Sequence, residues 1–367
     1  MAYTWGRNWW LTPLLIGTLA FSAGCGMSGS REAAPTLNNP QMELGVGDIE
    51  WKGDSDPSAE TGEHAEEHPV NTTRLTLYFA DGSDHVVPVT MTVPKVESIA
   101  HQALSFMVSG GPGEELLPEG FRALLPADTE MTVNVKPEQK LAIVDFNKNL
   151  LNYDANLGKE LLQAVTYSLT EFPTVEQVEV WVNGSPLTEL KDGTPVIQPL
   201  TRQRLGINLE LSDGARVGQT TAVTLYFEGI NDAGQSYLVP VTRLIPRTDD
   251  VARATVEELL RGPARGSGLS TSLNPEAKVL RVEHEGDLVV ADFDESLLSY
   301  FADATSASPE ALQSLVLSLT ENTQAERVQL LINGQDAVAA GMNLTEPMAR
   351  PAFVNPDIIH QANSSAS

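Results

Sequence analysis

The chain has almost no cysteine, and its basic residues are far outnumbered by acidic ones. Its 367 residues include a single cysteine, Cys25, so no internal disulfide can form and no zinc site built from several cysteines is possible. Lysine and arginine total 23 against 49 aspartates and glutamates, which gives a net charge of −26. Because nucleic-acid binding is driven by basic contacts to phosphate, and no basic patch with interleaved aromatic residues is present, the composition argues against a nucleic-acid partner.

Motifs of common enzyme classes are also missing. No glycine-rich loop continues to Gly-Lys-Ser/Thr, and the six histidines form no legible Ser-His-Asp set. His64 and His68 fit the pattern H-x-x-E-H with Glu67, but zinc needs both histidines on one face of a rigid helix. Here the pattern lies in an acidic stretch ahead of any domain, so we interpret it as a solvated Glu-rich run. The sequence predicts no cofactor and no metal site.

The N-terminus has the composition of a bacterial export signal. Arg7 supplies the positive region, and a short apolar run from Trp9 to Phe21 is too short to span a membrane comfortably. Residues 22–25, Ser-Ala-Gly-Cys, resemble a lipobox, with Ser22 where that pattern prefers Leu. The resemblance implies that residues 1–24 are a signal peptide and that Cys25 is lipidated, which anchors the mature protein at the outer face of a membrane.

The next segment is acidic and poor in apolar residues. Residues 26–70 carry ten Asp or Glu against Arg31 and Lys52. Such a stretch buries too little apolar surface to offset its ordering entropy, so residues 25–70 are predicted to be a disordered tether.

The rest of the chain contains one block of sequence twice. The matches keep their order, with offsets between 147 and 152 residues, so only short loops differ between two copies of one folding unit. The matching pairs are Leu77-Tyr78-Phe79 with Leu225-Tyr226-Phe227, Val87-Pro88-Val89 with Val239-Pro240-Val241, Asp145-Phe146 with Asp292-Phe293, Ser168-Leu169-Thr170-Glu171 with Ser318-Leu319-Thr320-Glu321, and Asn183-Gly184 with Asn333-Gly334.

Hydrophobic periodicity predicts the elements of each copy. Apolar residues alternate over residues 75–79 and 223–227, which is typical of a strand with one buried face, and an Asp- and Gly-rich turn then leads into a second strand. A helix, two strands, a second helix and a last strand follow. Each copy is therefore an α/β (α+β) unit of order ββαββαβ, with a mixed sheet and two helices. The predicted boundaries are 71–201 and 221–345, with a linker at 202–220 and a loose tail at 346–367.

Two prolines mark candidate contact surfaces. Pro88 and Pro240 lie inside the second strand of their copies, and proline cannot donate to a ladder, so these strands are predicted to be sheet edges. An exposed edge can accept a strand from another chain.

Four carboxylates recur at equivalent places and are the only candidates for acid–base chemistry. Paired carboxylates can act as general acid and base on a glycan. The recurrence of Asp145 with Asp292, and of Glu171 with Glu321, favours a structural role instead, because a catalytic site is usually kept in one copy and lost in the other.

The order of these motifs resembles that of the GerMN domain. Two such domains behind a lipobox resemble the GerM-type sporulation and spore-germination lipoproteins of endospore-forming Firmicutes. The resemblance implies a non-enzymatic role in protein–protein assembly at the septum between mother cell and forespore. There such proteins support a secretion-like channel on the mother-cell side of the intermembrane space. It also implies a likeness to the ring-building motif domains of secretion systems.

Two other functions stay open at this point. A wall-active enzyme or peptidoglycan binder needs the carboxylates to converge in a groove. A solute-binding lipoprotein of a transporter needs two domains joined by several crossing strands, whereas this chain has one linker between sequential copies.

Overall fold

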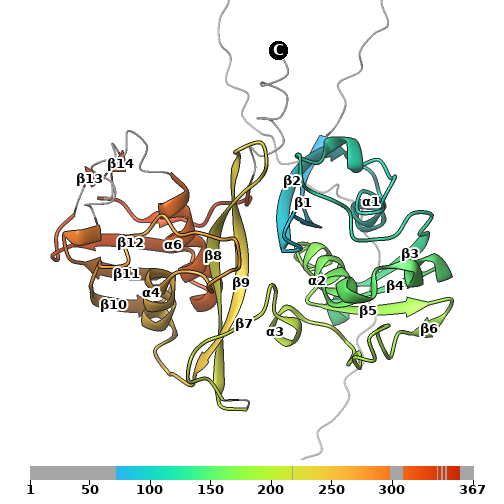
Figure 1. Ribbon diagram of the computed structural model, residues 1–367. Helices are drawn as coiled ribbons and strands as arrows, with labels where there is room; N and C mark the ends of the chain where they lie inside the picture. Colours follow the sequence, from blue (N-terminus) through green and yellow to red (C-terminus); the bar gives the residue numbers. More distant parts are fainter. Residues whose placement is uncertain are drawn as a thin grey trace, which may run out of the picture. The chain divides into compact units, whose positions relative to one another are not determined.

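The predicted element order is present in both copies of the repeat. The computed structural model describes residues 72–216, 218–297, 309–336, 338–339, 342–343 and 345–355. Within these residues each repeat runs ββαββαβ, and the fold is a mixed α+β one, as the sequence predicts (Figure 1).

The first repeat opens with a hairpin in which β1 (Thr72–Ala80) pairs antiparallel with β2 (Val86–Pro94). Short 3₁₀ turns join several of the later elements, at Glu114–Leu116, Pro137–Gln139, Lys148–Asn152 and Ala155–Leu157. The elements that follow the hairpin are α1 (Ile99–Ser105), β3 (Met131–Lys136), β4 (Leu141–Phe146), α2 (Gly158–Leu169), β5 (Gln177–Val182) and β6 (Ser185–Pro186).

The second repeat repeats this plan with longer hairpin strands, β8 (Thr220–Ile230) and β9 (Ser236–Pro246), which also pair antiparallel. The elements that follow are α4 (Val251–Arg261), β10 (Val279–Glu285), β11 (Leu288–Phe293), α6 (Pro309–Thr323), β12 (Arg327–Ile332), β13 (Val338–Ala339), β14 (Met342–Asn343) and β15 (Met348–Ala349).

The hairpin of each repeat stays separate from the mixed sheet, whereas the sequence analysis placed all strands of a repeat in one sheet. In the first repeat β1 and β2 pair only with each other, and the second sheet has the order β3-β4-β5-β6. In the second repeat the sheets have the orders β7-β9-β8 and β10-β11-β12-β15. The separation follows from the helices, because α2 packs between the hairpin and the sheet (Figure 1) and α6 contacts both β8 and β12.

The two long helices are buried almost all round. Every residue from Leu161 to Leu169 in α2 is buried, as is every residue from Ser314 to Thr320 in α6. A helix that is buried on all sides is expected where it has packing partners on both faces. Each helix also hydrogen-bonds the hairpin, since Ser168 Oγ accepts from Tyr78 N at 3.0 Å and Ser318 Oγ accepts from Tyr226 N at 2.9 Å.

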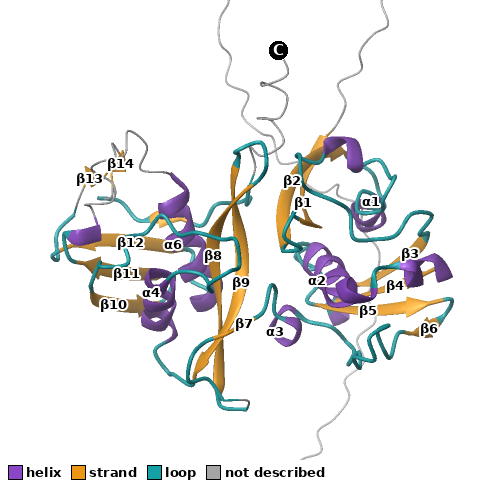
Figure 2. Cartoon of the chain, in the orientation of Figure 1, coloured by secondary structure: helices purple, strands orange, loops and turns teal. Residues whose placement is uncertain are grey.

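The predicted linker is folded against the second repeat. α3 (Arg202–Leu205) and β7 (Glu210–Leu211) are its regular elements within a stretch of loop (Figure 2), and β7 pairs parallel with β9 at Arg243 and Leu244. Arg243 reinforces this pairing, because its guanidinium donates to Glu210 Oε2 at 2.6 and 3.0 Å.

The first part of the predicted loose tail also belongs to the fold. β15 pairs antiparallel with β12, through Met348 with Val328 and Ala349 with Arg327. The first repeat has the same arrangement in reduced form, an antiparallel bridge between Val178 and Leu200. Each repeat therefore continues past its Asn-Gly turn, and the second repeat also continues past residue 345, where the sequence analysis ended it.

We predict that a chain ending at residue 345 is less stable than the full chain by at least about 3 kcal/mol. It loses β15 together with the hydrogen bonds of Arg350 and Asn355, and a hydrogen bond to a charged group contributes about 1.5–3 kcal/mol. Urea unfolding followed by circular dichroism measures the difference. A chain ending at Asn355 is the control, since it keeps every described contact. Equal stability of the two truncated chains would show that the segment contributes nothing.

Candidate functional site: the contact between the repeats

The hairpin of the first repeat meets that of the second through an asparagine side chain. Asn208 lies after α3, and its Oδ1 accepts from Val86 N at 2.8 Å. Its Nδ2 donates to Val86 O at 2.8 Å and to Pro240 O at 2.8 Å. One carboxamide therefore pairs with β2 as a strand would and also reaches β9.

A second asparagine repeats this contact with the roles of the hairpins exchanged. Asn355 Oδ1 accepts from Leu238 N at 2.8 Å, and its Nδ2 donates to Leu238 O at 2.9 Å and to Pro88 O at 2.8 Å. Val86 and Leu238 occupy equivalent places in the repeat, as do the two prolines. The contact is therefore self-complementary, like the isologous interface of a two-fold dimer. We call Asn208 and Asn355, with the four strand residues they bond, the asparagine clasp.

The prolines explain why the clasp uses side chains instead of a continuous ladder. Proline has no N–H, so neither Pro88 nor Pro240 can donate across to another strand. Their carbonyl groups accept from the asparagine amides instead. Both asparagines have positive φ, 46° at Asn208 and 53° at Asn355, a conformation that asparagine adopts more readily than most residues.

The strand edges at Pro88 and Pro240, predicted as partner surfaces, are buried within the chain. Both prolines are buried, and the free edge of each strand is bonded to an asparagine of the clasp. Contact of these edges with another protein stays a prediction, and such a contact would have to displace the clasp.

Two threonines extend the same pseudo-symmetric contact. Ile207 N donates to Thr242 Oγ1 at 2.9 Å, and Thr242 N donates back to Ile207 O at 2.7 Å. At the equivalent place Thr90 Oγ1 donates to Val354 O at 2.8 Å.

Glu171 and Glu321, two of the predicted acid–base candidates, are ion-paired. Arg202 Nη2 donates to Glu171 Oε1 at 2.6 Å, and Arg350 Nη2 donates to Glu321 Oε2 at 2.6 Å. Arg202 also reaches toward the other repeat, with its Nη1 at 3.9 Å from Glu321 Oε1.

Each of these arginines also bonds a backbone carbonyl group and a threonine hydroxyl of a buried helix. Arg202 donates to Tyr167 O at 3.1 Å and to Thr170 Oγ1 at 2.7 Å, at the end of α2. Arg350 makes the corresponding pair of bonds within α6, to Leu317 O at 3.1 Å and to Thr320 Oγ1 at 2.7 Å. At the end of α2 the cation of Arg202 is favourable because helix C-termini carry partial negative charge and unpaired carbonyl groups.

Buried tyrosines complete this network. Tyr78 OH donates to Glu171 Oε1 at 3.0 Å. Burial, followed by the nearby Glu171, raises the pKa of Tyr78 well above its usual value, and burial raises the pKa of Tyr167 to about 12. The pKa of Arg202 is raised although burial opposes its charge, because Tyr78, Glu171 and Glu321 surround it. The tyrosines therefore stay neutral and the arginine charged at physiological pH.

Asp145 and Asp292 have one identical structural task. Asp145 Oδ1 accepts from Gly184 N at 2.9 Å, and Asp292 Oδ1 accepts from Gly334 N at 2.8 Å. Each aspartate thus fixes the Asn-Gly turn after the last main strand of its repeat. The recurrence that the sequence analysis attributed to the fold has this physical reason.

The carboxylates of a repeat do not converge. β4 and β5 are parallel, so the connecting helix α2 runs back along the sheet and places Asp145 and Glu171 toward its opposite ends. The 12 residues of α2 span about 18 Å. Glycosidases hold their two carboxyl groups about 5–10 Å apart. Asp145 and Glu171 of one repeat are therefore not spaced as a glycosidase pair, whereas Glu171 and Glu321 of different repeats both approach Arg202.

A buried aspartate joins the repeats at a further point. Tyr237 OH, from β9, donates to Asp81 Oδ2 at 3.0 Å, and its ring packs edge-on against Phe121 with centroids 4.9 Å apart. Burial raises the pKa of Asp81, but hydrogen bonds from His85 and from Ser83 N outweigh it and hold the pKa below its usual value. Asp81 is therefore ionised and links the turn of the first hairpin to β9.

The remaining predicted residues lie elsewhere. Cys25, His64 and His68 are outside the described residues. Among the described residues, no group of three or more His, Cys, Asp or Glu side chains is placed to hold a metal ion. In the same part of the chain, no helix has the length and apolarity needed to cross a membrane.

Sequence analysis missed Asn208, Asn355, Arg202 and Arg350, which carry the contact. They lie in the segments taken as linker and tail, where hydrophobic periodicity is weak. A usable signal was present, because Thr201-Arg202 and Ala349-Arg350 follow the Asn-Gly turns at nearly equal distance, and each is followed by an asparagine a few residues later.

We predict that Asn208→Gly lowers the free energy of unfolding by about 1–3 kcal/mol. Glycine keeps the positive φ, but the buried N–H of Val86 and the carbonyl groups of Val86 and Pro240 lose their partner. Urea unfolding measures the loss. Asn333→Gly is the matched control, because Asn333 also has positive φ and is exposed in its turn. If Asn208→Gly lowers the free energy of unfolding no more than Asn333→Gly does, the asparagine clasp does not contribute to stability.

We predict that Asp81→Asn lowers stability by about 1.5–3 kcal/mol near pH 7 and by less in acid. The pKa of Asp81 is lower in the folded chain than its ordinary value of 3.8. Its contribution is therefore present above pH 3.8 and is lost as pH falls through the folded-state value. Thermal unfolding of both chains between pH 2 and pH 7 tests this. Tyr237→Phe is the control, since it removes one hydrogen bond and leaves the carboxyl group titrating. A stability difference between the unmodified chain and Asp81→Asn that does not change with pH would contradict the prediction.

Known proteins have the same tandem arrangement of two repeats. The family model "Germane: Sporulation and spore germination" matches residues 76–188 and 224–338, one match in each repeat. The spore germination protein GerM of Bacillus subtilis (strain 168) is 34% identical over 360 residues, which cover 94% of this chain and 98% of that protein. The solved tandem GerMN domains of the B. subtilis sporulation protein GerM are 36% identical, with a TM-score of 0.70, and the match covers 78% of this chain and 99% of that one. The chain therefore belongs to the Germane family of sporulation and spore germination, with two tandem GerMN domains.

Proposed function

We propose that this protein serves spore formation and germination as a non-catalytic assembly protein, anchored to the membrane through Cys25. Its place is the extracytoplasmic face, on the mother-cell side of the septum between mother cell and forespore. Membership of the Germane family supports the sporulation role, and the lipobox-like sequence at residues 22–25 supports the anchor.

One observation carries the non-catalytic part of the proposal. Each candidate carboxylate has the same structural partner in both repeats, a turn N–H for Asp145 and Asp292 and an arginine for Glu171 and Glu321. These contacts give each of the four carboxylates a task in the fold, which supports a non-catalytic role.

The contact between the repeats supports an assembly role. The two hairpins already form a self-complementary interface within one chain, which is the type of contact that builds symmetric assemblies. The partners of this proposal are other septal proteins of the sporulation channel, with the membrane reached through the lipid anchor. Nucleic acid is not among them, because the net charge is −26.

We predict that Cys25→Ala releases the protein from the membrane and lowers the yield of germination-competent spores in an endospore-forming host at least about tenfold. Two acyl chains give a stable anchor and their loss leaves none. Membrane fractionation and counts of heat-resistant, germinating spores are the measurements. Crosslinking of the lipidated protein in sporulating cells should recover septal channel proteins, and the Cys25→Ala chain should not.

Asp145→Asn is the matched control for catalysis. The amide oxygen still accepts from Gly184 N, so spore yield should match that of the unmodified protein. A loss of spore yield with a normally folded Asp145→Asn chain, together with retention of the purified protein on peptidoglycan, would support a wall-active role in place of this proposal.

A further inference from the structure

The outer edge of β1 presents an unpaired peptide group. Tyr78 is paired in register with Pro88, which has no N–H, and Tyr78 N donates to Ser168 Oγ on the other side. Peptide groups of an antiparallel strand alternate in direction. The N–H and C=O of Thr76, two residues earlier, therefore also point away from β2.

The second repeat closes the equivalent edge with a side chain. Thr224 occupies the place of Thr76, and its N donates to Asn322 Oδ1 at 2.8 Å. Asn322 Nδ2 donates to Thr224 O at 2.8 Å and to Ser318 O at 2.8 Å. A carboxamide has the donor and acceptor of a peptide group, so Asn322 takes the position that a neighbouring strand would occupy.

The first repeat has no such cap. Glu321-Asn322 in α6 corresponds to Glu171-Phe172 after α2, and a phenyl ring neither donates nor accepts as an amide does. No hydrogen bond joins the N–H or C=O of Thr76 to any group in the part of the chain that the structure describes. The two repeats therefore differ at the one position that decides whether this edge is open.

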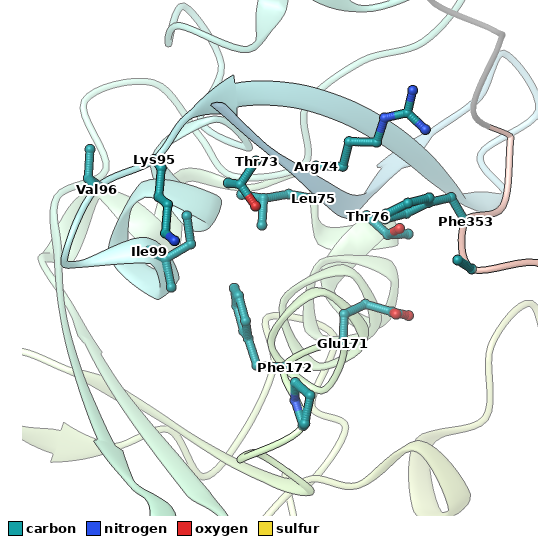
Figure 3. Close-up of a pocket in the computed structure, with 12 residues that line it drawn as sticks. Thr73, Arg74, Leu75, Thr76, Lys95, Val96, Ile99, Glu171, Phe172 and Phe353 are labelled. Atoms are coloured by element: carbon teal, nitrogen blue, oxygen red, sulfur yellow. The ribbon is translucent and has the colours of Figure 1, made fainter. Parts of the chain in front are cut away.

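A cavity of about 410 Å³ lies against the open edge. Phe172 projects into it from the end of α2, beneath Thr73, Leu75 and Thr76 of β1 (Figure 3). Ile99 and Phe353 add apolar surface to its wall. The space can take an apolar side chain beside the unpaired peptide group.

The charges at the cavity are positive. Arg74 and Lys95 line it, and within the described ranges neither has an ion-pair partner, although Arg74 lies 5.4 Å from the centre of the Phe353 ring. Glu171 also lines it, but its charge is matched by Arg202. This positive rim is unusual in a chain with a net charge of −26.

We propose that this edge binds an extended acidic segment of a partner protein by strand addition. One peptide group of the segment pairs with Thr76, as Asn322 pairs with Thr224. A neighbouring apolar side chain enters the cavity, and carboxylates on the segment contact Arg74 and Lys95. Strand addition takes its affinity from backbone hydrogen bonds and its selectivity from such side-chain pockets. The proposal does not depend on lipidation or on location at the septum.

Random dodecapeptides displayed on phage, selected on the purified full chain, test it. We expect the selected peptides to be acidic and rich in β-branched residues, and to bind Phe172→Asn at least tenfold more weakly than the unmodified chain. That substitution supplies the amide found at Asn322. Phe172→Leu leaves the edge open, so its affinity should stay within threefold, whereas Arg74→Glu should weaken binding at least tenfold.

Thr76→Pro is the second test, independent of packing at Phe172. Proline is tolerated on an edge strand whose N–H faces outward, as Pro88 shows in β2. The substitution removes the outward N–H, together with the hydroxyl that lies 3.3 Å from Thr90 Oγ1. We expect at least a tenfold loss of affinity with an unchanged circular dichroism spectrum. The proposal is overturned if no peptide is selected above the Phe172→Asn background, if the selected peptides are basic, or if both Phe172→Asn and Thr76→Pro bind as tightly as the unmodified chain.

Discussion

The missing N–H groups of Pro88 and Pro240 are the constraint on which the arrangement of the two repeats depends. A strand with proline at its centre cannot continue a ladder, so the two hairpins cannot merge into one sheet. Their facing carbonyl groups still need donors once buried, because an unpaired polar group there costs about 1–3 kcal/mol. Asn208 and Asn355 supply those donors, and each needs the positive φ it has to turn its amide between the strands.

The two buried helices, α2 and α6, each depend on an arginine that bonds their backbone. α2 and α6 are each enclosed between a hairpin and a sheet, and a carbonyl group of each helix accepts a hydrogen bond from an arginine. Arg202 bonds Tyr167 O at the end of α2, and Arg350 bonds Leu317 O within α6. Glu171 and Glu321 neutralise these arginines. Glu171 and Glu321 therefore have a defined structural task in the fold. The same logic holds for Asp145 and Asp292, whose partners are turn N–H groups.

Sequence patterns predict this fold only where they are periodic. Alternation at Leu75–Phe79 and its copy predicts the hairpins, and the duplicated motifs predict the order of elements correctly in both repeats. They do not predict that the hairpin stays apart from the mixed sheet, because a buried helix and an amphipathic one can share the same short apolar runs. Nor do they predict the segments around Arg202 and Asn355, which are held by single polar side chains with no period.

The internal duplication separates structural residues from specialised ones. Where the two copies agree, as at Ser168 and Ser318, the contacts agree too, and the shared residue serves the shared fold. Where they differ at a position with a defined contact, the fold alone does not explain the difference. Phe172 replaces the amide of Asn322, and among the described residues the peptide group of Thr76 has no partner beside an apolar cavity with cationic side chains. A duplicated domain that keeps one edge closed and the other open has lost its internal symmetry at a surface suited to a partner. Selectivity for that partner is therefore expected to lie in the first repeat. The second repeat, whose equivalent edge is closed by Asn322, shows the same strand without the binding position.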